Sequence, residues 1–246
     1  MAGREQETSR SPRGLSKRQE RAHRILDAAA SLILRWGYNK TTIDDIARQA
    51  GVAKGTIYLH WKTRDELFSA LLRREQLAMG RDFLEHITQD PKGATLRGIY
   101  KHTALALMKR PLLKALLLGD RDVVGKLAER EQGSAAYAEK LTGFEVYLEF
   151  LRERGLVRTD LKPRAQLQMA SAIMVGFFFL PTLTPDEYGL SDEETADLIG
   201  ETVQRALESG REVSPEEMRS LSDTFKQYLD RVWSMLEEQA REESEA

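Results

Sequence analysis

A short segment of this sequence, residues 54–62, carries a polar side chain at every second position. These side chains belong to Lys54, Thr56, Tyr58, His60 and Lys62. A lysine ammonium group pairs with phosphate oxygens, and threonine, tyrosine and histidine side chains hydrogen-bond to phosphates or to base edges. Gly55 lies among them and leaves the backbone bare for close approach by another molecule. The combination favours contact with a nucleic acid.

Signatures of catalysis are few in the rest of the chain. The sequence has no glycine-rich phosphate-binding loop, no HExxH motif and no GxSxG motif. Asp82 and His86 are one helical turn apart and could form a metal site with His102, but a solvated helix face is the favoured interpretation because no further ligands cluster there. We predict a protein that is not an enzyme and has no catalytic residue, metal or cofactor.

The charge of the chain is divided unevenly. Residues 1–64 hold thirteen Lys and Arg against six Asp and Glu, a net charge of +7, whereas the remainder holds 24 against 33, a net charge of −9. A basic front end suits a polyanion, and an acidic body is repelled by one. The alternative is that the division reflects only solvated surface.

The composition is that of a globular protein, with 41% hydrophobic residues, 31% charged residues and no cysteine among 246. Without cysteine the chain forms neither disulfides nor thiolate metal sites. The longest apolar run, Ile173–Leu180, is far shorter than the roughly 20 residues of a membrane helix. The N-terminal segment lacks the apolar centre of a signal peptide. We predict a cytoplasmic protein with no membrane partner.

Apolar residues recur every three or four positions almost throughout, which predicts an all-α protein. The expected helices cover residues 16–36, 43–51, 54–60, 65–87, 94–109, 112–118, 135–154, 163–180, 192–209 and 215–238. The charged stretch 120–134 is predicted as a break. Residues 1–15 are predicted to be a disordered tail, or alternatively an arm whose arginines reach a minor groove.

Two of these helices, 43–51 and 54–60, are short and are joined by a glycine-containing turn. They follow the helix at 16–36 in the sequence, and that helix is expected to pack against both. This is the layout of a helix-turn-helix unit. Its last helix begins unusually, because the N-cap position holds Ala53, which has no side-chain oxygen to accept a hydrogen bond. Such a start makes sense if a phosphate or a base edge supplies the missing acceptor.

The stretch from Ile25 to Phe68 resembles the TetR-like family of transcriptional regulators. The match consists, in order, of Gly37-Tyr38, Thr42, Ile46-Ala47, Ala50-Gly51-Val52, Gly55, Tyr58, His60 and Leu67. The sequence departs from the family pattern at Ala53, Trp61 and Arg64, where serine, phenylalanine and lysine are commonest in the family. Trp61 still suits a core position and Arg64 still supplies a charge.

The resemblance implies that the 54–60 helix enters the major groove of DNA. It implies groove or phosphate contacts from Lys54, Gly55, Thr56, Tyr58 and His60, and backbone anchors at Thr42 and Arg64. Lys62 joins this set because it is expected to face outward. Thr42 has an alternative role as a helix cap, and Tyr58 and His60 have alternative roles in packing.

The resemblance also implies a two-part architecture. A helix-turn-helix DNA-binding domain at residues 16–64 is joined by a long helix to a larger helical bundle at residues 65–246, which binds a small molecule and pairs with a second copy. Converging helix faces predict a cavity for a lipophilic ligand, lined by Met79, Phe83, Tyr100, Thr103, Leu107, Phe144 and Tyr147. Taken singly, each of these residues is better explained as plain core than as a ligand contact. Gly80, in the long helix, would admit a ligand or a neighbouring helix.

The family architecture implies pairing through the helices at 163–180 and 192–209. The candidate interface residues are Leu167, Ala170, Met174, Phe177, Leu198 and Val203. The three phenylalanines at 177–179 span nearly a full turn, so at least one faces a partner or a cavity unless all three lie in the core. The helix at 215–238 is additional to the family bundle, and it either extends the interface or covers the body.

These observations lead to the hypothesis of a homodimeric, ligand-responsive repressor, released from a palindromic operator on double-stranded DNA by a small lipophilic effector. Two alternatives remain open at this point. One is a constitutive or architectural helix-turn-helix DNA binder without a small-molecule switch. The other is a helical protein–protein interaction module.

Overall fold

The computed structural model describes residues 17–245, so the predicted disordered tail at 1–15 lies outside it. Within the described range the chain is helical and has no β-strand beyond an isolated bridge between Val157 and Glu208. The predicted all-α fold is confirmed. The elements are α1 (Lys17–Trp36), α2 (Ile43–Ala50), α3 (Lys54–Tyr58), α4 (Arg64–Gln89), α5 (Leu96–Met108), α6 (Pro111–Leu117), α7 (Arg121–Val124), α8 (Leu127–Gln132), α9 (Ala135–Glu153), α10 (Pro163–Phe179), η1 (Leu180–Thr182), η2 (Asp186–Tyr188), α11 (Asp192–Leu207) and α12 (Pro215–Glu245).

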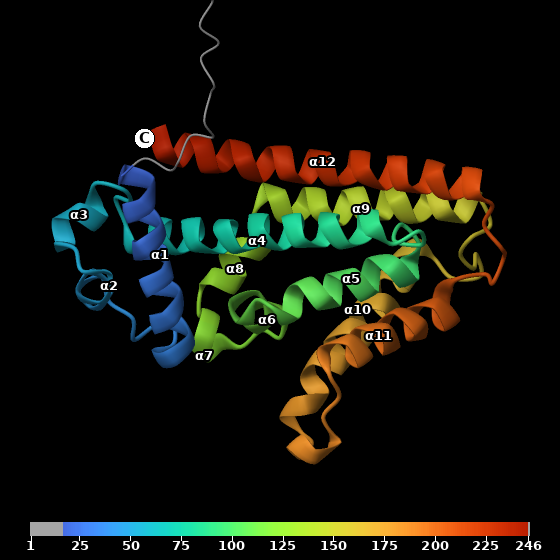
Figure 1. The fold of residues 1–246 in the computed structure, drawn as a ribbon, viewed down its shortest axis with the longest axis horizontal. Coiled ribbons are helices and arrows are strands. Elements are labelled where there is room, and N and C mark those ends of the chain that lie inside the picture. Colours follow the sequence, from blue (N-terminus) through green and yellow to red (C-terminus); the bar gives the residue numbers. More distant parts are fainter. Residues whose placement is uncertain (1–16, 246) are drawn as a thin grey trace, which may run out of the picture.

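Helices α1, α2 and α3 form a three-helix unit at one end of the molecule (Figure 1), which we call the head. Its core contains fully buried isoleucines from all three helices, including Ile25 of α1, Ile46 of α2 and Ile57 of α3. Trp61 packs against this core and is buried. Apolar burial of this kind is what stabilises short helices that would be marginal in isolation.

Helix α4 connects the head to the rest of the chain, which we call the body. Thr63 caps its start by accepting a hydrogen bond from the backbone N–H of Glu66 at 3.1 Å. Leu67 and Phe68, in the first turn, are fully buried. Farther along, α4 runs beside α12 and packs on α5 (Figure 1). One continuous helix therefore contributes to both parts of the molecule.

Helix α12 covers the body, packing against α9 and α4 along one side of the bundle (Figure 1). It buries Leu221 and Phe225. At Gly80 of α4, a Cβ atom would lie only 2.1 Å from the indole Nε1 of Trp233. The glycine thus admits a neighbouring helix, one of the two roles predicted for it, and α12 runs well beyond its predicted end at residue 238.

The charged stretch 120–134 is not the break that was predicted, because it contains α7 and α8. The Asp120 carboxylate caps α7 by accepting hydrogen bonds from the N–H groups of Asp122 and Val123 at 3.1 and 3.2 Å. The N–H of Tyr38, in the head, donates to the carbonyl oxygen of Val123 at 2.9 Å. These short helices depend on contacts with a distant segment, which sequence periodicity does not reveal.

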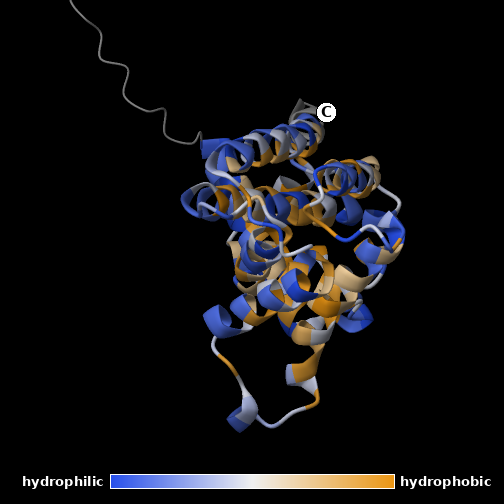
Figure 2. Ribbon diagram, turned by 90° about the vertical axis from the view of Figure 1, so that its right-hand side faces the viewer, coloured by the Kyte–Doolittle hydropathy of each residue, from blue (hydrophilic) through white to orange (hydrophobic). Residues whose placement is uncertain are grey.

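By length and composition, Pro163–Thr182 is long and apolar enough to cross a membrane, the one such stretch in the described range. It comprises α10 and η1, and α10 packs as a bundle helix against α11 and α9. Figure 2 shows further hydrophobic residues on the segment that projects between α10 and α11. Much of this apolar surface is not covered by the chain itself.

Candidate DNA-binding interface and ligand cavity

The turn between α2 and α3 has helix-turn-helix geometry. Gly51 ends α2 in the left-handed region, with φ +66° and ψ 38°, which glycine adopts without steric penalty. The N–H of Val52 then donates to the carbonyl oxygen of Ala47 at 3.0 Å. Ala53 is extended, with φ −69° and ψ 146°, and gives α3 no side-chain cap. The uncapped start expected for this helix is confirmed, although α3 ends at Tyr58 rather than His60.

Most side chains predicted to contact DNA are available on the head. Thr42, Lys54, Gly55, Tyr58 and Lys62 are exposed, and Thr56, His60 and Arg64 are partly buried. Tyr58 keeps 45% of its surface exposed, although aromatic residues usually bury more of theirs. Nothing lies within 4 Å of the position that a Cβ atom would take at Gly55. The bare backbone there is open to a partner molecule.

Two of these residues already have partners within the head. The Thr42 hydroxyl caps α2 by accepting from the N–H of Asp45 at 3.2 Å and donates to its carboxylate at 2.5 Å. Lys54 forms an exposed ion pair with Asp44 at 2.8 Å. Exposed pairs contribute only about 0–1 kcal/mol, so a phosphate can displace Asp44 at small cost.

Arg64 does not extend into solvent as the family resemblance implies. Its Nε donates to the carbonyl oxygen of Thr41 at 3.1 Å, and a second guanidinium nitrogen donates to the carbonyl oxygen of Tyr38. The guanidinium carbon lies 4.0 Å from the centre of the Tyr38 ring. Because carbonyl groups of the α1–α2 connection use these donors, Arg64 stabilises that connection, and its role as a DNA backbone anchor stays a prediction.

His60 lies beside Trp61, with 5.2 Å between the ring centroids. Burial lowers the pKa of His60, and the positive charges of Arg18 and Arg21 lower it further. The imidazole is therefore neutral at pH 7 in the free protein. It offers DNA a hydrogen bond rather than an ion pair.

Replacing Ala53 with serine is expected to raise the free energy of unfolding by about 1 kcal/mol. The extended backbone at this position suits an N-cap, and a serine hydroxyl oxygen can accept from the first N–H groups of α3. Urea denaturation measures the change, and Ala53→Val is the control because valine supplies no acceptor. If serine lowers both stability and DNA affinity, Ala53 is not the N-cap.

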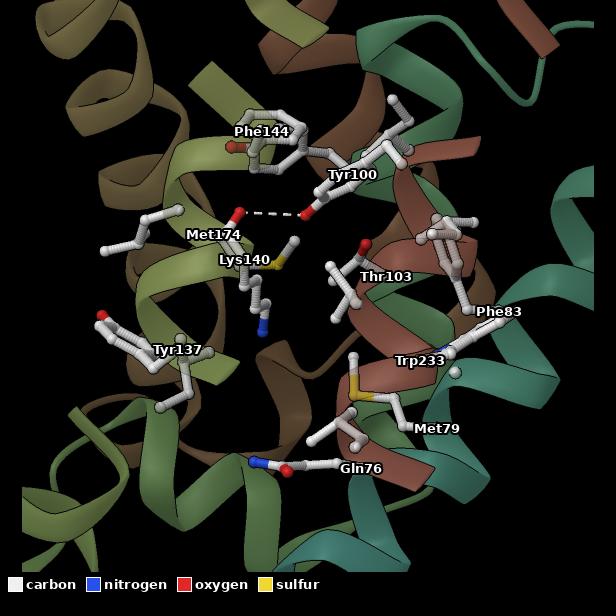
Figure 3. Close-up of a pocket in the computed structure, with 18 of the residues that line it drawn as sticks. Gln76, Met79, Phe83, Tyr100, Thr103, Tyr137, Lys140, Phe144, Met174 and Trp233 are labelled. Atoms are coloured by element: carbon white, nitrogen blue, oxygen red, sulfur yellow. Dashed lines mark hydrogen bonds between the residues drawn. The ribbon is translucent and has the colours of Figure 1, made fainter. Parts of the chain in front are cut away.

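A cavity of about 300 Å³ lies in the body between α4, α5, α9, α10 and α12 (Figure 3). Its volume is at the lower end of the range for small-molecule sites, and most of its lining is apolar. Five residues predicted to line a ligand site do so, namely Met79, Phe83, Tyr100, Thr103 and Phe144. They come from three different helices, and Figure 3 shows them around the same space.

Leu107 and Tyr147 do not line this cavity, so the prediction was wrong for both. Tyr147 is fully buried, and its hydroxyl donates to the carbonyl oxygen of Ala94 at 2.5 Å. Its ring lies 4.8 Å from that of Phe225 on α12, which covers this side of α9. Leu107 is buried in the core near the end of α5.

Few polar groups line the cavity, and they occupy separate places. The Tyr100 and Ser171 side chains are hydrogen-bonded (Figure 3), and burial strongly raises the pKa of Tyr100. Gln76 Nε2 donates to a Glu131 carboxylate oxygen at 2.5 Å. Lys140 extends its ammonium group into the space (Figure 3), where burial lowers its pKa and Glu131 acts in the opposite direction. The Lys140 side chain keeps accessible surface because it borders the hollow.

The sequence analysis missed the contribution of α12 and of Lys140. Helix α12 supplies Phe225, Tyr228, Leu229, Val232, Trp233 and Leu236 to the lining. The apolar stripe of this helix predicted that it packs, but the stripe carries no information about which helices it packs on. Lys140 is a single lysine in an amphipathic helix. The residues around it in the sequence do not distinguish it from a lysine on a solvent-facing helix surface.

The predicted dimer residues lie largely on the wrong side of their helices. Ala170, Met174 and Val203 are buried within the chain, at 2%, 5% and 0% exposure, and Leu167 lines the cavity. Buried side chains cannot meet a second copy, because the bundle already covers them. Phe177 is partly buried and Leu198 is 40% exposed. The exposed apolar residues nearby are Met169, Phe179, Leu180 and Leu183.

The three residues considered for a metal site have other partners. The Asp82 carboxylate pairs with Arg110 at 2.8 Å, and the His102 ring pairs with Asp90 at 2.8 Å. His86 contacts the Asp82 backbone carbonyl oxygen through Nδ1 at 2.5 Å. Among the described residues, no group of three or more histidines and carboxylates could hold a metal ion.

Residues 25–71 match the model of the bacterial regulatory proteins of the tetR family. The chain is 28% identical over 169 residues to the fatty acid metabolism regulator protein of Bacillus subtilis, covering 66% of this chain and 81% of that protein. It is 29% identical over 165 residues to the transcriptional regulator AcrR of Shigella flexneri, covering 65% of this chain and 75% of AcrR.

A similar fold occurs in the triclosan complex of SmeT, the repressor of a Stenotrophomonas maltophilia multidrug efflux pump. The two structures share 20% identity and superpose with a TM-score of 0.59 over 78% of this chain and 93% of SmeT. The helix-turn-helix head on a helical body defines the class as a DNA-binding transcriptional regulator. The match of residues 25–71, together with these relatives, places the DNA-binding head in the tetR family.

Proposed function

We propose that this regulator is a homodimeric repressor of a palindromic operator, released from DNA when a small lipophilic effector enters the cavity. Residues 16–64 read the DNA, and residues 65–246 hold the effector and the partner subunit. The protein acts by binding in the cytoplasm rather than by catalysis. Exposed Lys54 and Tyr58 on the short helix α3, together with the +7 charge of residues 1–64, support the DNA-binding part of this proposal.

The observation that carries the proposal is the continuity of α4. Its first turn places Phe68 in the buried core below the head, beside the Tyr38 ring at 5.0 Å between centroids. Three turns later the same helix lines the cavity with Met79 and Phe83. A ligand that contacts these side chains therefore bears on an element that also fixes the position of the head.

An effector shifts DNA binding only if it prefers one arrangement of the two heads over the other. Heads that read successive major grooves must be about 34 Å apart. Filling or widening the space beside Met79 displaces α4, and with it the head, from that spacing. The expected loss of operator affinity corresponds to a coupling of about 1–3 kcal/mol, which is about 5- to 150-fold.

For the dimer we propose the outer side of α10, η1 and α11. Met169, Phe179, Leu180 and Leu183 are between 36% and 68% exposed, and Leu198 of α11 is 40% exposed. Clustered exposed apolar residues are typical of a protein interface. This surface replaces Ala170, Met174 and Val203, which the sequence pattern had suggested.

Selection of bound sequences from a random duplex pool tests the proposal. The expected product is a palindrome whose half-sites lie one or two helical turns apart. Fluorescence anisotropy then compares the selected duplex with a scrambled one across a salt series, with and without lipophilic compounds. Equal affinity for both duplexes would show that the protein does not read sequence.

A further inference from the structure

The cavity has an uneven chemical lining. Among its lining residues Lys140 is the single basic side chain and Glu131 the single acidic one. Most of the remainder is aliphatic or aromatic, with the Tyr100–Ser171 pair on one side and Thr103 near it (Figure 3). A site of this kind orients an apolar ligand through a few fixed polar contacts.

Lys140 is not neutralised by a direct partner within the described residues. No hydrogen bond or ion pair joins its ammonium group to another side chain between residues 17 and 245. The nearest candidate, Glu131, has one carboxylate oxygen engaged by Gln76 Nε2 at 2.5 Å. The Lys140 side chain keeps accessible surface at the border of the cavity, so an anionic ligand can reach its ammonium group and form a charge-assisted hydrogen bond.

We propose that the effector is a lipophilic carboxylic acid, whose carboxylate pairs with Lys140 while its apolar body lies against Met79, Phe83 and Trp233. This inference rests on the proposed function, because it names the ligand class of the same cavity. Glu131 accepts a hydrogen bond from Gln76 and acts on Lys140 through its charge, without a direct ion pair between the two side chains. Burial by the surrounding helices lowers the pKa of Lys140, and the charge of Glu131 acts in the opposite direction.

The size of the cavity limits the ligand. At the roughly 30 Å³ that a water-sized group occupies, a 300 Å³ cavity holds about ten non-hydrogen atoms. The probes are octanoate, which matches this size and has an alkyl body, and 2-naphthoate, which is slightly larger and has a flat aromatic body. Comparing them distinguishes an aliphatic acid from an aromatic acid as the preferred class.

Isothermal titration calorimetry on the full chain without DNA tests the inference, with octanoate, octan-1-ol, octylamine and 2-naphthoate as ligands. Octanoate or 2-naphthoate is expected to bind about 10-fold or more tightly than octan-1-ol, and octylamine more weakly still. Fluorescence of Trp233, which lines the cavity, provides a second readout. Equal binding of octanoate and octan-1-ol by the unmodified protein overturns the inference.

Variants locate the charge contact. In Lys140→Met the preference for octanoate over octan-1-ol should fall about 10-fold or more, and in Lys140→Arg it should be largely kept. Lys109→Met is the matched control, because Lys109 is exposed at the end of α5 and outside the cavity lining. An unchanged preference in Lys140→Met, with a native circular dichroism spectrum, overturns the assignment to Lys140.

The experiment also separates this inference from the function on which it rests. If no member of the series binds, the cavity is not an effector site, and both proposals fail. If octan-1-ol binds and weakens operator binding as strongly as octanoate does, the ligand-responsive function stands and the acid-specific inference fails.

Discussion

Replacing Phe179 with aspartate is expected to convert the dimer into monomers and to weaken operator binding by roughly 1,000-fold or more. Phe179 is 49% exposed at the end of α10, and its neighbours Leu180 and Leu183 are exposed as well. A carboxylate introduced there must lose its water to enter an apolar interface, which is strongly unfavourable. A monomer reads only one half-site, so it retains little beyond the non-specific affinity, roughly 10³-fold or more weaker.

Light scattering coupled to size-exclusion chromatography measures the oligomeric state, and anisotropy with the selected duplex measures the affinity. Val146→Asp is the matched control, because Val146 is 63% exposed on α9 and is not one of the residues proposed for the interface. The control should stay dimeric and bind the operator normally. A dimeric Phe179→Asp protein would place the interface elsewhere on the chain.

A second large effect is expected at the contact between α8 and the start of α4. Asp65, in the first turn of α4, accepts a hydrogen bond from the Tyr38 hydroxyl at 2.5 Å and pairs with Arg130 at 2.6 Å. The bond from Tyr38 and the charge of Arg130 both hold the pKa of Asp65 below its usual value. Glu131, the residue that follows Arg130 in the sequence, lines the cavity. Helix α8 thus contacts the start of α4 and the ligand site through adjacent residues.

Arg130→Gln is therefore expected to reduce the effect of a ligand on DNA binding about 10-fold, while operator affinity without ligand changes little. The substitution removes the ion pair to Asp65 but leaves Glu131 in the cavity. The coupling is obtained from operator affinity with and without saturating octanoate, and from octanoate affinity with and without operator, since the two must agree.

Arg121→Gln is the matched control for this experiment, because Arg121 is an exposed residue on the neighbouring helix α7. It should leave the coupling unchanged. If Arg130→Gln and the unmodified protein respond equally to octanoate, the signal does not pass through α8.

The head was predictable because its signals are local. Thr42 caps α2 and Gly51 ends it, and both follow from residue type at a known spacing. The internal hydrogen bonds of Arg64 were not predictable, because they depend on carbonyl groups of Tyr38 and Thr41, which lie more than twenty residues earlier. A charge in the sequence does not show whether the protein itself already uses it.

The body was less predictable because its site is built from distant segments. The periodicity of α5 identified Tyr100 and Thr103 as inward-facing, but it also selected Leu107, one turn farther into the core. Lys140 becomes a site residue only when α4, α8 and α12 enclose it. Helix α10 is apolar both on the side that faces the cavity and on the opposite side. Its sequence pattern therefore did not show which side would contact a partner subunit.

The close approach of Trp233 to Gly80 has a consequence for how such a regulator can diversify. The last helix supplies six of the residues that line the cavity, whereas the exposed side chains predicted to meet DNA lie on α3 and beside it. Substitutions confined to this C-terminal segment can therefore alter which molecules are recognised without altering the promoter that is read. A library randomised at Tyr228, Val232 and Trp233 could be screened for variants that respond to new effectors while binding the same operator. Gly80 must be retained in such a library, because a side chain there would collide with the residue at position 233.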